Sequence, residues 1–173
     1  DTGRVLYGYN TNEKKLIAST TKIMTALIAI EKGNLEDVIE ITDIIYKAYG
    51  SAIYIEVGEK LTLKDLIYGL MLRSGNDASL SIAEYISGSK EEFVYLMNEY
   101  ANNLGLKNTM FYNPHGLEED DGNANKSSAY DMAKLTKYAM ENSVFREIFK
   151  TKKYTVKTNY KTYSWTNKNK ILG

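Results

Sequence analysis

The chain has 173 residues, the length of one compact domain or at most two small lobes. Its 22 Lys and Arg residues balance 22 Asp and Glu residues, so the chain lacks the net positive charge that is typical of nucleic-acid-binding proteins. The 43% hydrophobic content excludes general disorder, and the absence of Cys excludes disulfides, a thiolate nucleophile and Cys-ligated zinc. With a single His, a Ser-His-Asp triad or a His-based metal cluster is a poor prospect, and we expect neither metal nor cofactor.

The first part of the chain predicts a short strand and then a buried helix. Residues 4–9 are typical of a strand. The pattern changes at Ser19, and from Ile23 to Ile30 apolar residues occupy every face, which is typical of a helix buried on all sides. Gly33 supplies its end. No stretch reaches the ~18 apolar residues of a membrane span, and no signal peptide is recognisable. The abrupt start and end of the pattern lead us to expect that both ends are cut.

Three more helices are predicted by their capping residues. They begin at Thr62 with Asp65, at Ser89 with Glu92, and at Ser128 with Asp131. The first should run to about Leu72, and Gly105 should end the second. A short strand is expected over residues 51–56, and residues 154–157 and 160–165 predict a hairpin that turns at residues 158–159. The prediction is a helix-rich α+β domain with few strands for its sheet.

Ser19 and Lys22 form a Ser-x-x-Lys pair where the buried helix begins. Serine is a weak nucleophile until a base removes its proton, and residues three apart on a helix lie on one face, so Lys22 could reach Ser19. Helix-start amide groups would favour negative charge beside Ser19. Burial lowers the pKa of a lysine, and a neutral amine can serve as a general base. This layout favours acyl transfer through a covalent serine ester.

The Ser-x-x-Lys pattern alone has low specificity, because it should occur about once by chance in a chain of this size. A second copy, from Ser87 to Lys90, lies in a polar turn before a helix, where capping explains it. The ordinary interpretation of Ser19 and Lys22 is likewise a helix cap beside a surface lysine.

Ser74-Gly75-Asn76 is the only Ser-x-Asn in the chain, and it follows the apolar helix that begins at Thr62. Its ordinary interpretation is a loop and helix cap, with Gly75 supplying a special backbone angle and Asp77 in a first helical turn. Its functional interpretation places a hydroxyl and an amide in the same cleft. There Ser74 could relay a proton to the leaving group, and Asn76 could bond both Lys22 and a substrate amide. The two motifs together, 55 residues apart, are rare by accident.

At these motifs the chain resembles the low-molecular-weight penicillin-binding proteins that are serine-type D-alanyl-D-alanine carboxypeptidases. The two motifs that carry the resemblance lie in residues 18–26 and 74–78. Supporting stretches follow in family order at residues 57–66, 93–98, 104–106, 113–117 and 127–133. The likeness extends from about Asp1 to Leu172.

The resemblance implies a bacterial cell-wall hydrolase that acts outside the cytoplasm, secreted or anchored to the membrane through segments outside this chain. Its partners would be the pentapeptide stems of peptidoglycan, from which it removes the terminal D-alanine, and β-lactam antibiotics, which acylate the same serine. The implied fold is the helix-rich part of a β-lactamase/transpeptidase-like (DD-peptidase) fold, with part of the central antiparallel sheet missing from this chain.

The matching motifs also imply roles for single residues. Ser19 would be the nucleophile and Lys22 its base, with Ser74 and Asn76 as the second catalytic element. Ser19, Ser74 and Asn76 would touch the substrate, and the backbone amide of Ser19 would supply half of the oxyanion hole.

The family's third element, Lys-Thr-Gly or Lys-Ser-Gly on a core strand, does not occur in this chain. Residues 157–159 and 161–163 come nearest, but they lack the glycine that lets a ligand approach the strand closely. Residues 167–172 are similar to the run that precedes the true triplet. We therefore expect residues 1–173 to be a partial penicillin-binding domain with very weak activity, its third motif lying beyond Gly173. A second chain, or strand exchange between copies, could complete the sheet.

Two other functions stay open. A class A β-lactamase shares Ser-x-x-Lys and uses a glutamate-activated water, and Glu119 and Asn123 have the matching spacing, although the run between them is polar. Rapid nitrocefin turnover would favour that enzyme. A non-catalytic binding module is supported by the absent third motif, and a complete protein that fluorescent penicillin does not label would favour it. We expect His115 to be structural, and residues 118–121 to form a solvated loop and not a calcium site.

Overall fold

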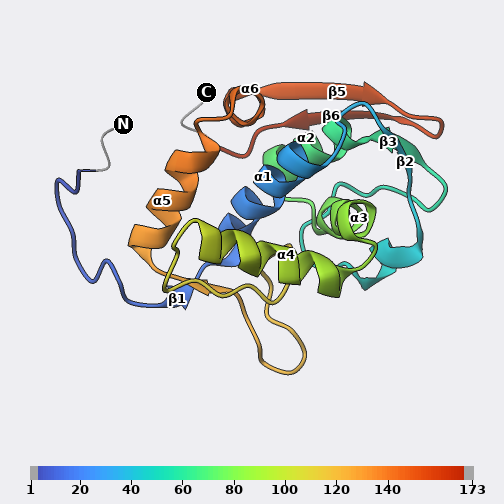
Figure 1. Ribbon diagram of the computed structural model, residues 1–173. Coiled ribbons are helices and arrows are strands. Elements are labelled where there is room, and N and C mark those ends of the chain that lie inside the picture. The colour runs from blue at the N-terminus through green and yellow to red at the C-terminus, as the bar shows by residue number, and fades with distance from the viewer. Residues whose placement is uncertain (1–3, 170–173) are drawn as a thin grey trace.

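The structure of the protein is a computed structural model that describes residues 4–169 (Figure 1). In chain order its elements are β1 (Lys15–Leu16), the 3-10 helix η1 (Ala18–Thr21), α1 (Lys22–Lys32), β2 (Val38–Glu40), the 3-10 helix η2 (Asp43–Lys47), β3 (Lys60–Thr62), α2 (Leu63–Arg73), α3 (Asn76–Ser87), α4 (Lys90–Asn103), β4 (Lys126–Ser127), α5 (Ala129–Ala139), α6 (Ser143–Lys150), β5 (Lys153–Lys157) and β6 (Thr162–Thr166). Helices predominate, and within residues 4–169 the strands pair antiparallel as β1–β4, β2–β3 and β5–β6. The helix-rich α+β class is confirmed.

Helix α1 is the centre of the molecule because its sequence is apolar on every face. Its fully buried apolar side chains are those of Met24, Ala26, Leu27, Ile28 and Ala29. The helix contacts α2, α3, α4, α5 and α6. In Figure 1 the β5–β6 hairpin lies on one side of it, along α2, and α4 lies on the opposite side. The predicted buried helix is confirmed, except that the turn that contains Ser19 is the 3-10 helix η1.

The starts of α2, α4 and α5 follow the predicted caps. Thr62 and Asp65 form a complete capping box, in which the backbone N–H of Asp65 donates to Thr62 Oγ1 (3.1 Å) and that of Thr62 donates to Asp65 Oδ2 (2.9 Å). Ser89 and Ser128 each accept a hydrogen bond from the backbone N–H three residues later. Gly105, with φ of +64°, takes the left-handed conformation that ends α4. These three helices are confirmed.

Two predicted strands are absent from the described residues. Residues 4–9 are irregular and exposed, and no neighbouring strand satisfies their backbone. Residues 51–56 are also irregular, because the backbone N–H groups of Ile53, Tyr54 and Ile55 donate to the carboxylate of Asp77 in α3 instead of to a strand. Tyr54 has φ of +62°, outside the region that strands adopt.

The predicted C-terminal hairpin is confirmed as β5 and β6, which pair Tyr154 with Trp165. Tyr163 and Trp165 point inward and are buried, and the ring of Tyr154 stacks on Tyr68 of α2 at 3.7 Å. The turn extends to residue 161, because the backbone N–H of Thr158 donates to the carbonyl of residue 161. This packing fixes the hairpin against the helix that leads into Ser74.

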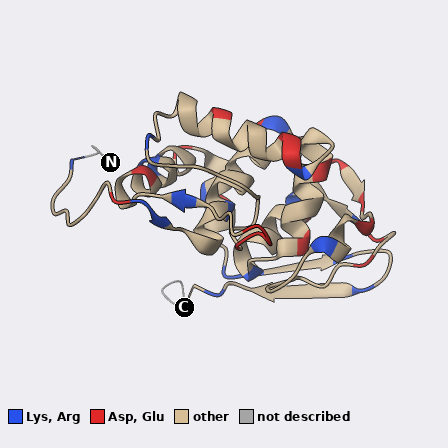
Figure 2. Cartoon of the chain, turned by 90° about the horizontal axis from the view of Figure 1, so that it is seen from below, with Lys and Arg blue, Asp and Glu red and all other residues tan. Residues whose placement is uncertain are grey.

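Sequence patterns did not predict α6, which begins after an Asn142 cap. Among residues 4–169 we find no helix with both the length and the apolar composition needed to cross a membrane. Acidic and basic residues are interspersed along the elements visible in Figure 2. The predictions for residues 1–3 and 170–173 lie outside the described residues.

Candidate active site

The amine of Lys22 is the centre of a polar cluster inside the helical core. Lys22 is the first residue of α1 and is only 3% exposed. Its Nζ donates to oxygens from three parts of the chain: Ser19 Oγ at 3.4 Å, Asn76 Oδ1 at 2.7 Å and the backbone carbonyl of His115 at 2.8 Å. Ser19 itself lies in η1 and is exposed. An accessible hydroxyl therefore lies beside a desolvated amine, as the spacing of the motif predicted.

Burial makes this amine easier to deprotonate. It lowers the pKa of Lys22 from 10.5 to about 8, and the positive charge of Lys168 acts in the same direction, while Asp77 opposes both. At pH 7 a pKa of about 8 leaves about one amine in ten neutral, whereas the ordinary value leaves about three in ten thousand. Lys22 can therefore accept a proton near neutral pH.

The Ser74-Gly75-Asn76 turn joins α2 to α3 and lies against the same amine. Ser74 takes the left-handed conformation with φ of +61°, whereas Gly75 has an ordinary φ of −65°. The expectation that Gly75 supplies the special backbone angle is therefore wrong. Glycine is needed there for space, because a Cβ would lie 2.9 Å from Asp77 Oδ1 and 3.0 Å from Ile53. A non-glycine residue with positive φ is backbone strain of the kind that collects at functional sites.

The side chains of Ser74 and Asn76 in this turn differ in their hydrogen bonding. The Oγ of Ser74 is buried and has no hydrogen-bond partner in the part of the chain that the structure describes. Asn76 is 2% exposed; its Oδ1 accepts from Lys22, and its Nδ2 donates to the backbone carbonyl of Tyr49 at 2.5 Å. An amide oxygen has two lone pairs, so Oδ1 can still accept a second hydrogen bond from a ligand.

The loop of residues 113–119 forms the opposite wall. The carbonyl of Pro114 accepts from Thr25 Oγ1 (2.7 Å) and Ser79 Oγ (2.6 Å), which attaches the loop to α1 and α3. The next carbonyl, that of His115, is thereby directed at Lys22. Gly116 has φ of +95°, and a Cβ at this position would lie 1.9 Å from the carbonyl oxygen of Ala18. The loop therefore packs directly on the backbone that precedes Ser19.

Replacing Gly116 by Ala is expected to lower the free energy of unfolding by about 3 kcal/mol or more, because strained φ and a backbone clash add. Gly122→Ala is the matched control, since Gly122 also has positive φ (+79°) but no atom lies within 4 Å of its added Cβ. That variant should lose only about 1 kcal/mol. Urea unfolding followed by circular dichroism measures both. Equal losses would show that the close approach to Ala18 does not matter.

His115 contributes its backbone and not its ring. Burial, helped by the positive charge of Lys22, lowers the pKa of the imidazole to about 4, so the ring is neutral at pH 7. Its Nδ1 accepts from the backbone N–H of Leu117 at 3.1 Å. Sequence reasoning missed the carbonyls of His115 and Tyr49, because every residue type carries a carbonyl and no side-chain pattern marks one.

Other residues considered from the sequence are engaged elsewhere. Lys90 pairs with Glu119 at 3.0 Å, and Asn123 bonds Asp121. Residues 157–159, one of the two near matches to the third motif, lie at the turn of the β5–β6 hairpin. There Thr158 donates to Glu59 Oε1 at 2.5 Å. Within residues 4–169, no group of three or more His, Cys, Asp and Glu side chains is placed to hold a metal ion.

Comparison with known proteins gives this cluster its context. The sequence model of the family described as D-alanyl-D-alanine carboxypeptidase, Peptidase S11, matches residues 1–173. The chain belongs to this family. It is 49% identical over 142 residues to the D-alanyl-D-alanine carboxypeptidase DacF of Bacillus subtilis, covering 79% of this chain and 36% of that protein. It is 40% identical to a D-alanyl-D-alanine carboxypeptidase of Streptomyces, covering 99% of this chain and 64% of that protein.

Solved structures show the same fold. The DD-transpeptidase of Streptomyces K15 superposes with a TM-score of 0.90 at 36% identity, over 99% of this chain and 71% of that one. A D-alanyl-D-alanine carboxypeptidase of Mycobacterium tuberculosis superposes with a TM-score of 0.93 at 28% identity, over 99% and 64%. The predicted DD-peptidase type of fold is confirmed. The chain spans 36% and 64% of the length of the two curated relatives.

Proposed function

We propose that the protein containing this chain is a serine D-alanyl-D-alanine carboxypeptidase that trims peptidoglycan stem peptides outside the cytoplasm and is acylated by β-lactams. The observation that carries the proposal is the position of Lys22 Nζ, in hydrogen-bond contact with both Ser19 Oγ and Asn76 Oδ1. Membership of the D-alanyl-D-alanine carboxypeptidase family supports the substrate class.

In this mechanism the neutral amine of Lys22 takes the proton of the Ser19 hydroxyl as Oγ attacks the carbonyl carbon of the penultimate D-alanine. The negative charge on the carbonyl oxygen is met by the backbone N–H of Ser19. Collapse breaks the C–N bond, and the proton that Lys22 took from Ser19 passes through the hydroxyl of Ser74 to the departing amine of the terminal D-alanine, which leaves Lys22 neutral again. The Oγ of Ser74 is suited to this relay because it has no hydrogen-bond partner among the described residues.

The second half of the cycle consumes water. The ester carbonyl of acylated Ser19 is attacked by a water molecule that gives its proton to Lys22, and the Ser19–acyl bond then breaks. The stem peptide leaves with a new carboxyl group, which gives up its proton to solvent, and Lys22 returns the proton that it took from water to Ser19 Oγ. Asn76, which bonds Lys22 through Oδ1, holds the amine in place during both steps and accepts from a substrate N–H.

Residues 1–173 would form a partial penicillin-binding domain in this proposal. A Lys-Thr-Gly or Lys-Ser-Gly triplet beyond Gly173 would bind the substrate carboxylate and add strands to the sheet, or a second chain would complete it. The greater length of the curated relatives supports this part. Release of D-alanine from a D-Ala-D-Ala peptide by residues 1–173 alone, at ordinary enzyme rates, would contradict it.

Fluorescent penicillin tests the central proposal on the protein at its full natural length. We expect one adduct per molecule by intact mass, and peptide mapping should place it on Ser19 and not on Ser87 or Ser89 of the second Ser-x-x-Lys. The rate of nitrocefin hydrolysis is measured in parallel. An adduct elsewhere, or none, would refute the carboxypeptidase proposal, and rapid nitrocefin turnover would favour a β-lactamase.

A further inference from the structure

Lys22 is held between two walls that are far apart in the sequence. One wall is the Ser74–Asn76 turn, which supplies Asn76 Oδ1, and the other is the 113–119 loop, which supplies the carbonyl of His115. The two oxygens lie 2.7 and 2.8 Å from the amine. The orientation of the amine toward Ser19 therefore depends on the spacing of the two walls.

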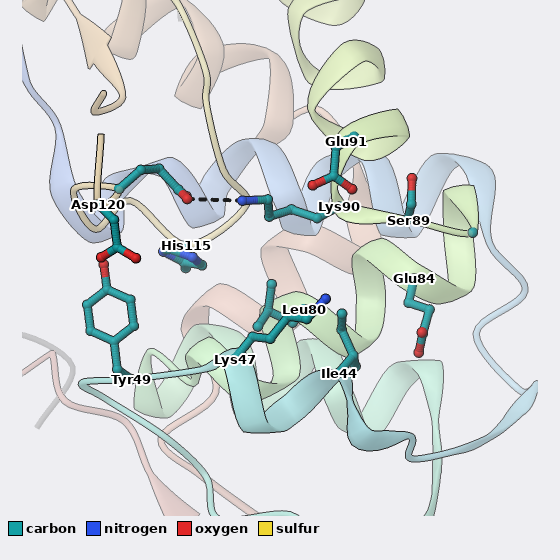
Figure 3. A pocket seen from close by; sticks show the side chains of 12 residues that line it. Ile44, Lys47, Tyr49, Leu80, Glu84, Ser89, Lys90, Glu91, His115 and Asp120 are labelled. Carbon is teal, nitrogen blue, oxygen red and sulfur yellow. Dashed lines mark hydrogen bonds and ion pairs between the residues drawn. The ribbon is translucent and has the colours of Figure 1, made fainter. Parts of the chain in front are cut away.

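Tyr49 contacts both walls. Its backbone carbonyl accepts from Asn76 Nδ2 at 2.5 Å. Its hydroxyl donates to the backbone carbonyl of Glu118, and its ring meets the His115 ring edge-on, with the centroids 6.2 Å apart. Figure 3 shows the Tyr49 side chain extending from its own segment toward the loop that carries Asp120, with His115 beside it. One residue thus attaches the Asn76 wall to the His115 wall.

The loop is packed firmly at Pro114 and Gly116, but its outer part at Glu119 borders open space. A cavity of about 590 Å³ separates it from η2 and the start of α4, and Tyr49, His115 and Glu119 line this cavity. Across the cavity the loop is attached by the Lys90–Glu119 ion pair at 3.0 Å, drawn as a dashed line in Figure 3. Because a void supplies no dispersion contacts, such polar attachments hold the outer part of the loop in place.

We propose that Tyr49 is a positioning residue for the acylation reaction: its hydroxyl bond to Glu118 holds the loop so that the His115 carbonyl stays on the amine of Lys22. The inference rests on the proposed function for its kinetic consequence. Tyr49 does not touch the reacting atoms. It acts through Asn76 and the His115 carbonyl, which contact the amine of Lys22.

If Tyr49 has this role, losing its hydroxyl should shift the protonation of Lys22 toward the neutral amine, a change that general loosening of the fold would not cause. The His115 carbonyl bonds the charged form of Lys22 more strongly than the neutral form, so its departure favours the neutral amine. The other charged or titratable groups that act on Lys22 are Asp77 in α3, Lys168 after β6 and the neutral His115 ring. None of these is altered when only a hydroxyl is removed from Tyr49.

The test is the pH dependence of penicillin acylation in the full-length Tyr49→Phe protein. We expect a plateau rate about five- to tenfold lower, corresponding to one lost hydrogen bond, and a midpoint lower by about half a pH unit. Tyr46→Phe is the matched control: Tyr46 lies three residues earlier in η2, is 79% exposed, and its hydroxyl makes no hydrogen bond within the described residues. It should behave like the wild type.

The Glu119→Gln variant, alone and combined with Tyr49→Phe, completes a double-mutant cycle. Because the ion pair and the Tyr49 hydroxyl attach the same loop, the effects of the two single changes should not add in the double variant. An unchanged profile in Tyr49→Phe, a lower plateau with an unchanged midpoint, or additive effects would each overturn the inference.

A second measurement separates this inference from the proposed function. The Cε chemical shift of ¹³C-labelled Lys22, followed against pH and assigned by its loss in Lys22→Met, reports protonation without any reaction. If penicillin fails to acylate Ser19, the proposed function fails, while a lowered Lys22 midpoint in Tyr49→Phe alone still supports the positioning role. An unshifted midpoint in that variant rejects the role whatever the activity.

Discussion

Lys22→Met is expected to slow the acylation of Ser19 by penicillin at pH 7 by about a thousandfold, within the range of general base catalysis. Methionine keeps most of the volume of the side chain but has no amine to accept the Ser19 proton. It also leaves Asn76 Oδ1 and the His115 carbonyl without their present donor. The rate constant is measured with fluorescent penicillin on the full-length protein.

The pH dependence gives this prediction a second readout. In the wild type the rate should rise with pH through about 8, since the neutral amine is the reactive form and its pKa has that value. In Lys22→Met this rise should disappear. Lys32→Met is the control, because Lys32 is an exposed lysine at the opposite end of the same helix α1. A rate in Lys22→Met within tenfold of the wild type would exclude Lys22 as the base.

Asp77→Asn is expected to lower the free energy of unfolding by about 3 kcal/mol, the cost of leaving one or two buried donors unpaired. Asp77 is 4% exposed, and its carboxylate accepts from the backbone N–H groups of residues 53, 54, 55 and 78. An asparagine offers one acceptor oxygen, and its NH₂ group would face donors. The irregular 51–56 segment would then lose part of its attachment to α3, keeping the bond from the backbone N–H of Asn76 to the carbonyl of Ser51.

The same substitution should also alter the chemistry of the site. The negative charge of Asp77 raises the pKa of Lys22, so its removal should lower that pKa further below 8. Urea unfolding measures the first effect, and the pH profile of acylation measures the second. Asp43→Asn, at an exposed position in η2, is the control and should leave both unchanged. Asp77→Asn with wild-type stability would show that the backbone N–H groups of residues 53–55 find other acceptors.

Local sequence signals predicted the elements whose causes are local. The Thr62–Asp65 capping box, the Ser89 and Ser128 caps and the all-round apolar pattern of α1 each operate within a few residues, so they could be read from the sequence. The 51–56 strand was predicted wrongly because its composition is strand-like, whereas its backbone donors are satisfied by a carboxylate 22–24 residues later in the chain. Helix α6 was missed although its apolar residues have helical spacing, because it is only eight residues long and its cap, Asn142, is not followed by an acidic residue in the first turn.

Residue types and their spacing establish the chemistry available to this protein: a serine and a lysine on one helical turn, an asparagine in a Ser-x-Asn turn, and the motifs of a D-alanyl-D-alanine carboxypeptidase. Tertiary structure alone decided how that chemistry is directed. The carbonyls of His115 and Tyr49 reach Lys22 and Asn76 across 93 and 27 residues of chain. A backbone carbonyl has the same chemistry in every residue, so only the folded path of the chain makes these two different from the rest.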